Sequence, residues 1–363
     1  MNHDYLNIIG LMTGTSMDGI DISLVRTNGI DLKRLDQNYF YKFNKKTREF
    51  LFRVLTKDVN FILKRKKKLD KIITEEHYKA LKNLDILEKS DVIGFHGQTI
   101  YHKPEENTSI QLGDPKKLAE MLNKNVVFDF RSNDLASKGQ GAPLAPIYHK
   151  FIIENLNLKL PSCILNIGGI SNLTYWDGNK LIGFDTGPGN ALMDDYSLII
   201  FNKNYDKDGS IASRGTPIKN EIIKFLQNDF FKKPPPKSLD RLSFLNSYNE
   251  LIEKNYPVYD TMATLVEYTT ESISASLEIL PKKVDNILIT GGGYRNLHLM
   301  NRLKNKLKLK IYNEKQLGLN FDYVEAELIA YLTARSIYKL PFTFPSTTGV
   351  LKPLSGGKLY QCL

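Results

Sequence analysis

The stretch GLMTGTSMDGID at residues 10–21 places hydroxyl and acidic side chains between two glycines, Gly14 and Gly19. A P-loop would continue from its second glycine with lysine and then serine or threonine, but here Ile20 and Asp21 follow. Apolar and polar residues then alternate, which is the period of a half-buried strand. The stretch therefore predicts two strands joined by a glycine-containing turn.

Such a turn can still bind a phosphate group. Consecutive backbone N–H groups form a concave anion site, to which Thr13, Thr15 and Ser16 would add hydroxyl donors. Asp18 and Asp21 would approach a phosphate only through a cation, usually Mg²⁺ bound through water. An ordinary tight turn with polar side chains is the alternative that the stretch itself leaves open.

A second candidate is FDTGPGN, residues 184–190. Asp185 is expected at the C-terminal end of a strand, where α/β sheets bind ligands, and a carboxylate there could act as a general base. The turn from Gly187 to Gly189 precedes a helix expected to begin near Asn190, so its N–H groups could hold phosphate. Asp185 could equally cap the turn without any chemical role.

A third turn contains three consecutive glycines, Gly291, Gly292 and Gly293, between an expected strand and an expected helix. Glycines allow a flat ligand to lie against the backbone, but a tight strand-to-helix turn would use them as well. The spacing lacks the third glycine of a dinucleotide-binding fingerprint. On its own this turn leaves both interpretations open.

Three further side chains could bind a substrate. His96 stands at a strand end beside Gly-Gln-Thr and could donate to a sugar hydroxyl or be purely structural, and the other histidines have no metal-ligand spacing. Arg131 could bind a carboxylate with two parallel hydrogen bonds. Glu325 and Glu327 flank Ala326 at the start of an expected helix and must point in different directions, so only one of them can face a cleft.

The elements that position these residues form two similar series. At 363 residues the chain exceeds one typical core. Each half begins with an apolar strand, a glycine turn and an outgoing strand, and continues with strands that alternate with helices. This pattern predicts an α/β protein with an internal duplication, in which two related domains face each other across a cleft.

Composition narrows the class of protein. The apolar fraction of 42% is that of a globular chain, no stretch approaches the 18 apolar residues of a membrane span, and two cysteines cannot form a disulfide framework. We therefore expect a cytoplasmic protein without a membrane partner. The net charge of +10 is concentrated in KRKKK, Lys64–Lys68, which lacks a nucleic-acid-binding motif and is expected to be a solvated helix face.

Several motifs together resemble one family, that of the anhydro-N-acetylmuramic acid kinases. Its motifs occur in order along nearly the whole chain: GLMTGTSMDGID, GFHGQT, DFRSNDLASKGQGAPLAP, LNIGGISNLT, FDTGPGNALMD, ITGGGYRN and EAELIAYL. The resemblance implies the actin-like ATPase and sugar kinase fold, with two ribonuclease H-like domains facing each other across a nucleotide cleft. Residues 1–130, joined by the tail 340–363, would form the first domain and residues 131–339 the second.

The resemblance also implies roles for individual residues. Asp185 matches the catalytic aspartate, and His96, Arg131 and Glu325 match positions near the amino sugar. The nucleotide-binding positions would be Gly14, Thr15, Ser16, Met17, Asp18, Gly19, Ile20, Asp21, Gly187, Gly189, Asn190, Gly291, Gly292 and Gly293. ATP and Mg²⁺ would be required, with the magnesium ligands unassigned, and the protein would be a homodimer.

The activity implied is the opening and phosphorylation of 1,6-anhydro-N-acetylmuramic acid in peptidoglycan recycling. Asp185 would deprotonate a water that attacks the anomeric carbon, and the released bridge oxygen would attack the γ-phosphate of ATP. An actin- or chaperone-like ATPase without a sugar substrate is the alternative, and an RNA-binding protein is a third, which would bind in a strongly salt-dependent way. Near KSLDRLSF, residues 237–244, the sequence departs from the family pattern.

Overall fold

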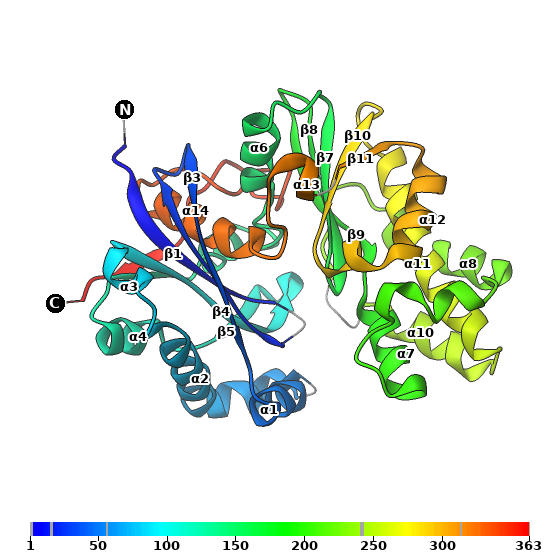
Figure 1. Ribbon diagram of the computed structural model, residues 1–363, viewed down its shortest axis with the longest axis horizontal. Coiled ribbons are helices and arrows are strands. Elements are labelled where there is room, and N and C mark those ends of the chain that lie inside the picture. The colour runs from blue at the N-terminus through cyan, green and yellow to red at the C-terminus, as the bar shows by residue number, and fades with distance from the viewer. Residues whose placement is uncertain (1–2, 15–16, 56, 240–242, 313, 363) are drawn as a thin grey trace. The chain divides into compact units, whose positions relative to one another are not determined.

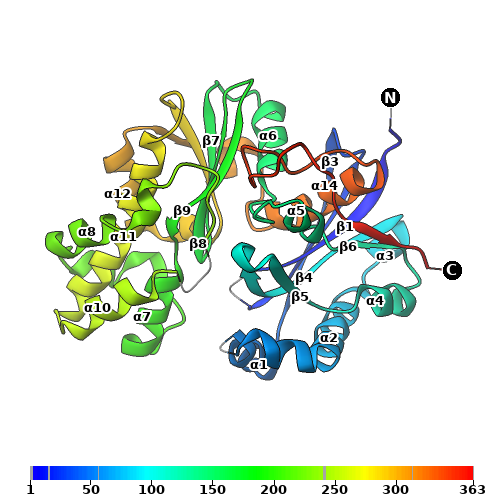
Figure 2. The same cartoon turned by 180° about the vertical axis from the view of Figure 1, so that it is seen from behind.

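A computed structural model shows an α/β protein that divides into two compact units (Figures 1 and 2). It describes residues 3–14, 17–55, 57–239, 243–312 and 314–362. Unit 1 contains residues 1–151 and 322–363, and unit 2 contains residues 152–321. Each unit is built on one sheet.

The elements of unit 1 comprise one large sheet and the helices that cover it. The strands are β1 (Leu6–Thr13), β2 (Gly19–Thr27), β3 (Leu32–Lys42), β4 (Val92–Lys103), β5 (Thr108–Leu112), β6 (Val126–Phe128) and β12 (Lys358–Tyr360). The helices are α1 (Lys45–Leu55), α2 (Val59–Leu81), α3 (Ile86–Lys89), η1 (Pro104–Glu106), α4 (Pro115–Leu122), α5 (Ser132–Ala136) and α14 (Val324–Ile337), and α6 (Pro146–Asn155) leads from unit 1 into unit 2.

Unit 2 has a smaller sheet and more helices. Its strands are β7 (Ser162–Ile167), β8 (Ile170–Trp176), β9 (Leu181–Pro188), β10 (Asn286–Thr290) and β11 (Lys310–Tyr312). Its helices are α7 (Ala191–Phe201), η2 (Lys207–Gly209), η3 (Ala212–Arg214), α8 (Lys219–Leu226), α9 (Asp229–Lys232), α10 (Leu245–Glu253), α11 (Val258–Glu278), η4 (Gly292–Arg295), α12 (Leu297–Leu307) and α13 (Glu314–Leu317).

The two sheets share one strand order. In unit 1 the order β3-β2-β1-β4-β6 begins with three antiparallel strands, and β4 and β6 then run parallel to β1. Unit 2 repeats the order and the directions as β9-β8-β7-β10-β11. This confirms the predicted duplication and the ribonuclease H-like class of each unit.

The expected domain boundaries at residues 130 and 339 are replaced by boundaries at 151 and 321. The helix α14, which was expected in the second domain, packs against β1, β2 and β4 of unit 1. The sequence could not show this, because an apolar helix pattern does not specify which of two similar sheets it covers.

Two glycines explain how closely α14 approaches its sheet. A Cβ added to Gly10 would lie 1.9 Å from the carbonyl oxygen of Ala326, and one added to Gly94 would lie 2.1 Å from Oγ1 of Thr333. The neighbouring residues Ile9 and Leu11 point to the opposite face, into the core shared with α1, α2 and α4. The sheet of unit 1 is therefore covered on both faces (Figure 1).

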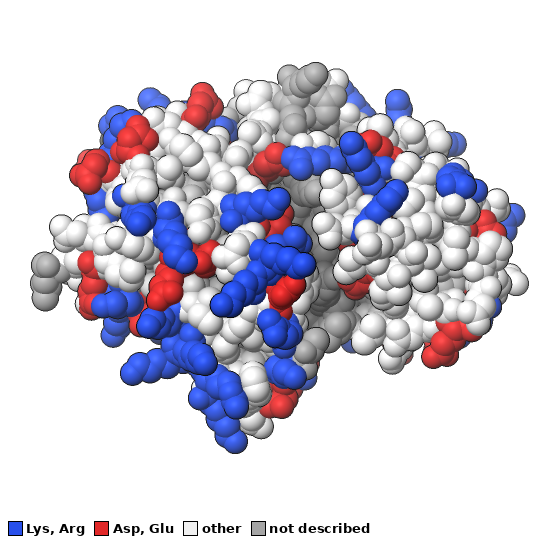
Figure 3. All heavy atoms as spheres, turned by 60° about the horizontal axis from the view of Figure 1, so that its bottom comes forward, with Lys and Arg blue, Asp and Glu red and all other residues white. Residues whose placement is uncertain are grey.

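The basic segment Lys64–Lys68 lies on α2, where Lys64, Arg65, Lys67 and Lys68 are exposed. Figure 3 shows basic side chains gathered on this part of the surface, with acidic ones among them. Lys66 forms an ion pair with Asp70. The predicted helix and the exposure of its basic side chains are confirmed. Among the described residues, no helix is long and apolar enough to cross a membrane.

Candidate functional site

The first glycine turn joins β1 to β2, as predicted. Thr15 and Ser16 lie outside the described residues. Met17 has a positive φ of 52°, and its side chain is buried in the core, so only its backbone could face a ligand. Gly19 is packed tightly, since an added Cβ would lie 2.4 Å from the carbonyl oxygen of Tyr41. The side chain of Ile20 is also buried.

The hydroxyl of Thr13 donates to the carbonyl oxygen of Gly97 over 2.8 Å, and Nε2 of Gln98 donates to the carbonyl oxygen of Gly14 over 3.2 Å. The turn is thus tied to the end of β4, the strand that carries His96. The predicted role of Thr13 as a free hydroxyl donor is not what the structure shows.

Asp21 lies in an acidic environment at the start of β2. Burial raises the pKa of Asp21 to about 8, and the nearby carboxylates of Glu325, Asp18 and Asp322 raise it further in that order. Within the described ranges, no group of three histidine, cysteine or acidic side chains is arranged to hold a metal ion. A cation bound through water could approach Asp21 without such a group.

Glu325 and Glu327 point in different directions, as predicted. Glu325 lies near Asp21, whereas Glu327 is buried and bonded to Arg34 and Tyr148. Nε of Arg34 lies 2.9 Å from Oε1 of Glu327, and the hydroxyl of Tyr148 donates to Oε2 of Glu327 over 2.5 Å. This buried network fixes the first turn of α14, which carries Glu325.

His96 and Arg131 are in direct contact. The Nε and Nη2 groups of Arg131 approach Nε2 of His96 at 3.2 and 3.0 Å, and Nη1 donates to the carbonyl oxygen of Gly141 over 2.7 Å. Nδ1 of His96 lies 2.8 Å from the carbonyl oxygen of Gly97. Burial and then Arg131 lower the pKa of His96 to about 3, so the ring is neutral, with its proton on Nδ1. His96 therefore orients the guanidinium of Arg131.

The loop that follows Arg131 is anchored by Asp134, which sequence reasoning did not single out. Oδ1 of Asp134 accepts from the backbone N–H of Gly141 over 2.6 Å, and Oδ2 accepts from the hydroxyl of Thr348 over 2.6 Å. Gly141 in turn holds Arg131. The only sequence signal for Asp134 is its place inside the long motif DFRSNDLASKGQGAPLAP.

Asp185 lies within β9, which continues to Pro188, so the strand end expected at Asp185 is wrong; its side chain is buried. The pairing of β8 with β9 shifts between Ser171 and Asn172, which leaves Thr186 as an extra residue. Bulges of this kind redirect neighbouring side chains. The backbone N–H of Asp185 donates to the carbonyl oxygen of Lys237 over 2.9 Å, and Oδ2 of Asp185 accepts from the N–H of Leu239 over 2.7 Å.

The glycine turns of unit 2 converge although they are far apart in the sequence. A Cβ on Gly189 would lie 2.2 Å from the carbonyl oxygen of Gly168, and one on Gly291 would lie 2.2 Å from Oδ1 of Asn166. Gly293 is equally close to Ile167. Of the three glycines of the third turn, Gly292 is the one with open space beside it, with Nδ2 of Asn190 3.8 Å from an added Cβ. One side of this turn can therefore accept a ligand.

The N–H groups proposed to hold phosphate at residues 187–190 have protein partners. Gly189 and Ala191 donate to the carbonyl oxygen of Gly169 over 2.9 and 3.2 Å, and Asn190 donates to that of Gly168 over 2.7 Å. Their geometry shows that they shape the turn between β7 and β8. This turn corresponds in topology to the turn at residues 14–19 in unit 1.

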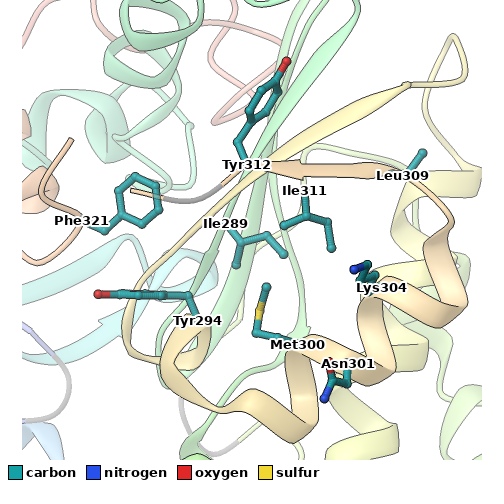
Figure 4. A pocket seen from close by; sticks show the side chains of 9 residues that line it. All are labelled: Ile289, Tyr294, Met300, Asn301, Lys304, Leu309, Ile311, Tyr312 and Phe321. Carbon is teal, nitrogen blue, oxygen red and sulfur yellow. The ribbon is translucent and has the colours of Figure 1, made fainter. Parts of the chain in front are cut away.

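A cavity of about 250 Å³ lies next to the third glycine turn (Figure 4). Ile289, Met300 and Ile311 face one another in it, and Tyr294 and Phe321 stand at one side. The rings of Tyr294 and Phe321 meet edge to face with centroids 5.6 Å apart. Asn301 and Lys304 also line it, so the cavity combines apolar and aromatic walls with two polar side chains, a lining that can accept a flat organic ligand.

Comparisons with known proteins agree with these motifs. A sequence model of the family "Anhydro-N-acetylmuramic acid kinase" matches residues 6–362. The kinase of that name from Rhodopseudomonas palustris (strain ATCC BAA-98 / CGA009) is 37% identical over 366 residues, which cover 98% of this chain and 99% of the relative. The one from Zymomonas mobilis subsp. mobilis is 38% identical over 368 residues, or 97% and 99%.

Among solved structures, the activator of the 2-hydroxyisocaproyl-CoA dehydratase from Clostridium difficile with bound ADPNP has a TM-score of 0.45 and 14% identity, with 92% of this chain and 97% of that chain covered. The family itself is shown by the sequence comparisons, which extend over nearly the full length. The chain belongs to the anhydro-N-acetylmuramic acid kinase family.

Proposed function

We propose that this protein uses ATP to convert 1,6-anhydro-N-acetylmuramic acid, with hydrolytic opening of its ring, into N-acetylmuramic acid 6-phosphate for peptidoglycan recycling. The match of the family model over residues 6–362 carries this proposal. The local geometry within each unit supports it, because Arg131 in unit 1 and Asp185 in unit 2 are each held by hydrogen bonds.

Asp185 is the proposed general base. Its carboxylate takes a proton from water, whose oxygen forms a bond to the anomeric carbon while the bond from that carbon to the bridge oxygen breaks. The freed oxygen then attacks the γ-phosphate and ADP leaves. General-base catalysis contributes about 100- to 10,000-fold. The hydrogen bond from Leu239 to Oδ2 supports this role because it fixes the direction of the carboxylate.

The amino sugar is proposed to bind at His96, Arg131 and Glu325. His96 and the carbonyl oxygen of Gly141 both contact the guanidinium of Arg131. These contacts orient the guanidinium before substrate arrives. An oriented guanidinium suits the carboxylate of the sugar's lactyl group. Preorganisation of this kind lowers the entropy lost on binding.

The nucleotide is proposed to contact the glycine turns of both units. In unit 1 the backbone around Gly14, Met17, Asp18 and Gly19 would face phosphate. Thr15 and Ser16, which lie outside the described residues, are proposed as nucleotide-binding from the sequence motif alone. Buried Ile20 would support the turn.

In unit 2, Gly187, Gly189 and Asn190 would act by shaping the turn at Gly168–Gly169. Gly291, Gly292 and Gly293 would lie against the nucleoside, with its base in the cavity beside Tyr294.

Mg²⁺ is proposed to bind through water near Asp21. The raised pKa of Asp21 supports this placement, because carboxylates crowd there and a divalent cation would offset their repulsion. When bound, the ion neutralises charge on the phosphates during transfer. The part that Asp21 plays is to orient the hydrated ion.

We further propose that the protein is a cytoplasmic homodimer with no nucleic-acid partner. The exposed apolar run Leu198–Ile200 at the end of α7 is the proposed dimer surface, and Ile199 is 69% exposed. Sedimentation of the wild type and of Ile199→Lys tests the dimer. A single monomeric mass for the wild type would contradict it.

The decisive experiment for the function is incubation with Mg²⁺-ATP and the anhydro-sugar, with mass detection of the products. The expected result is one 6-phosphorylated sugar, which contains one added water, for each ADP. ATP hydrolysis that proceeds equally without the sugar would instead support the actin- or chaperone-like alternative. Weak ATP turnover together with strongly salt-dependent RNA binding would support the alternative that this is an RNA-binding protein.

A further inference from the structure

We propose that Lys237 is a positioning residue that holds the catalytic carboxylate of Asp185 through the backbone of residues 237–239. This inference rests on the proposed function of Asp185 as the base. It assigns a role to a buried lysine that the reaction scheme itself does not use.

The side chain of Lys237 is enclosed by apolar groups. Only 4% of the residue is exposed. Its ammonium donates to the carbonyl oxygen of Phe230 over 3.1 Å, and it lies 4.5 Å from the ring centroid of Phe230 and 5.7 Å from that of Phe184. Aromatic faces attract a cation, and the attraction grows when water is excluded. The lysine is therefore held at a defined place.

The same segment makes both of the hydrogen bonds described for Asp185. The carbonyl oxygen of Lys237 accepts from the N–H of Asp185, and the N–H of Leu239 donates to its Oδ2. β9 is an edge strand of its sheet, so no strand among the described residues pairs with its outer side. Residues 237–239 take the place of that partner and also fix the carboxylate.

The segment needs an anchor because it is not part of a helix or strand. It follows α9 and the three prolines Pro234, Pro235 and Pro236, which restrict the backbone before the lysine. Phe184 is the residue immediately before Asp185, so the ammonium contacts the strand and the helix α9 at once. Loss of the ammonium would free residues 237–239 and with them the carboxylate.

Burial, and then Lys233, lower the pKa of Lys237 to about 8, which still leaves it mostly charged near neutral pH. Burying a charge costs stability unless the site offers strong partners. The charge of Lys237 is buried at a cost in stability, next to the carboxylate of Asp185. A role in orienting that carboxylate explains this lysine better than a gain in stability does.

The test replaces Lys237 by methionine, which keeps the length and the apolar stem but removes the ammonium. Turnover of the anhydro-sugar with Mg²⁺-ATP should fall about 10- to 100-fold in kcat, since small misplacements of a reacting group have effects of this size. The KM values for both substrates should stay within about twofold. Lys233→Met, at an exposed lysine four residues earlier in the chain, is the matched control and should leave kcat unchanged.

A double-mutant cycle with Asp185→Asn separates positioning from general damage. If Lys237 acts only through Asp185, then Lys237→Met should not lower the residual rate of Asp185→Asn by more than about twofold. If Lys237→Met lowers the rate of Asp185→Asn as much as it lowers that of the wild type, the proposal is overturned. Phe230→Leu, which removes one ring but keeps the carbonyl oxygen, should show a smaller loss and the same lack of additivity.

The outcomes also separate this inference from the proposed function. Wild-type turnover in Asp185→Asn would contradict the base assignment. A collapsed rate in Asp185→Asn together with an unchanged kcat in Lys237→Met would overturn only the role of the lysine. A Lys237→Met chain whose circular dichroism is that of an unfolded protein would also overturn it, since the lysine would then serve the fold as a whole.

Discussion

Asp185 has a buried carboxylate, a fixed hydrogen-bond partner in Leu239 and a place beside a bulge in β9. Asp185→Asn keeps the shape but removes the basic lone pair. We expect kcat to fall at least about 100-fold, the usual scale of general-base catalysis. Binding of ATP and sugar, measured by calorimetry, should remain near normal because the loss belongs to the transition state. The exposed Asp229 provides a control, and Asp229→Asn should be fully active.

Arg131 shows how a side chain can be oriented by its neighbours. Arg131→Lys keeps the charge but cannot approach His96 and Gly141 with a planar fork. We expect a raised KM for the anhydro-sugar with little change in ATP binding, from steady-state kinetics and calorimetry. Arg26→Lys, at an exposed arginine, is the control. Unchanged sugar kinetics in Arg131→Lys would remove this residue from the site.

We expect Asp21 to lower the stability of the folded protein while it contributes to the binding of Mg²⁺-ATP. Because its folded pKa of about 8 lies above its ordinary value of 3.8, the folded state loses stability as pH rises between these values. Each pH unit in that window costs about 1.4 kcal/mol. Asp21→Asn should therefore raise the melting temperature at pH 8 while weakening Mg²⁺-ATP binding. A lower melting temperature at pH 8 would contradict the placement of Asp21 near other carboxylates.

At the level of elements, α14 depends on two glycines in the strands beneath it. In Gly10→Ala the new Cβ would meet the backbone of Ala326 and Ala330, which cannot move without moving the helix. Overpacking of this kind typically costs 1–3 kcal/mol, which urea unfolding would measure. Because α14 carries Glu325, the KM for the sugar should rise as well. A variant as stable as the wild type would show that α14 can shift freely.

The strands and turns were predictable because their signals are local. Gly19 after Asp18 indicates a turn, and the apolar run before Asp185 indicates a strand, although β9 continues past the expected end to Pro188. The contacts that finish the site are not local. Arg131 meets His96 across 35 residues, and Leu239 meets Asp185 across 54. Nothing in the type of Leu239 indicates that its backbone N–H would hold a carboxylate.

The phosphate-binding interpretation of residues 187–190 shows a related limit. Glycines before a helix predict free N–H groups, yet those of Gly189 and Asn190 donate to the turn at Gly168–Gly169. The sequence indicates that a close approach occurs, because glycine tolerates it. It does not indicate whether the approaching group is a ligand or another part of the chain.

For the whole molecule, the duplication gives two units with the same strand order but different distributions of histidine. The histidines with strongly lowered pKa values all lie in unit 1, namely the buried His77 at about 4, the half-buried His102 at about 4, and the buried His96 and His149 at about 3. Unit 2 contains His298, whose pKa is also lowered but without so large a change. The two units should therefore respond differently to acid.

The direction of that response follows from proton binding. Below the ordinary histidine pKa of 6.5, the unfolded chain takes up protons that folded unit 1 does not, so stability is present above pH 6.5 and is lost as pH falls toward 4. At pH 5 each such histidine costs about 2 kcal/mol. Asp21 has the opposite effect, because its raised pKa makes the folded state more stable as pH falls over this range. This gain offsets the loss of stability from about one of the four histidines.

We expect two calorimetric transitions, of which the one from unit 1 shifts to markedly lower temperature between pH 7 and pH 5 while the other changes little. His77→Leu identifies the transition of unit 1, since His77 is buried against Phe95 and its removal deletes one protonation step. This variant should reduce the acid shift of that transition alone. If both transitions shift equally, or if His77→Leu leaves the shift unchanged, the buried histidines do not control the acid stability of unit 1.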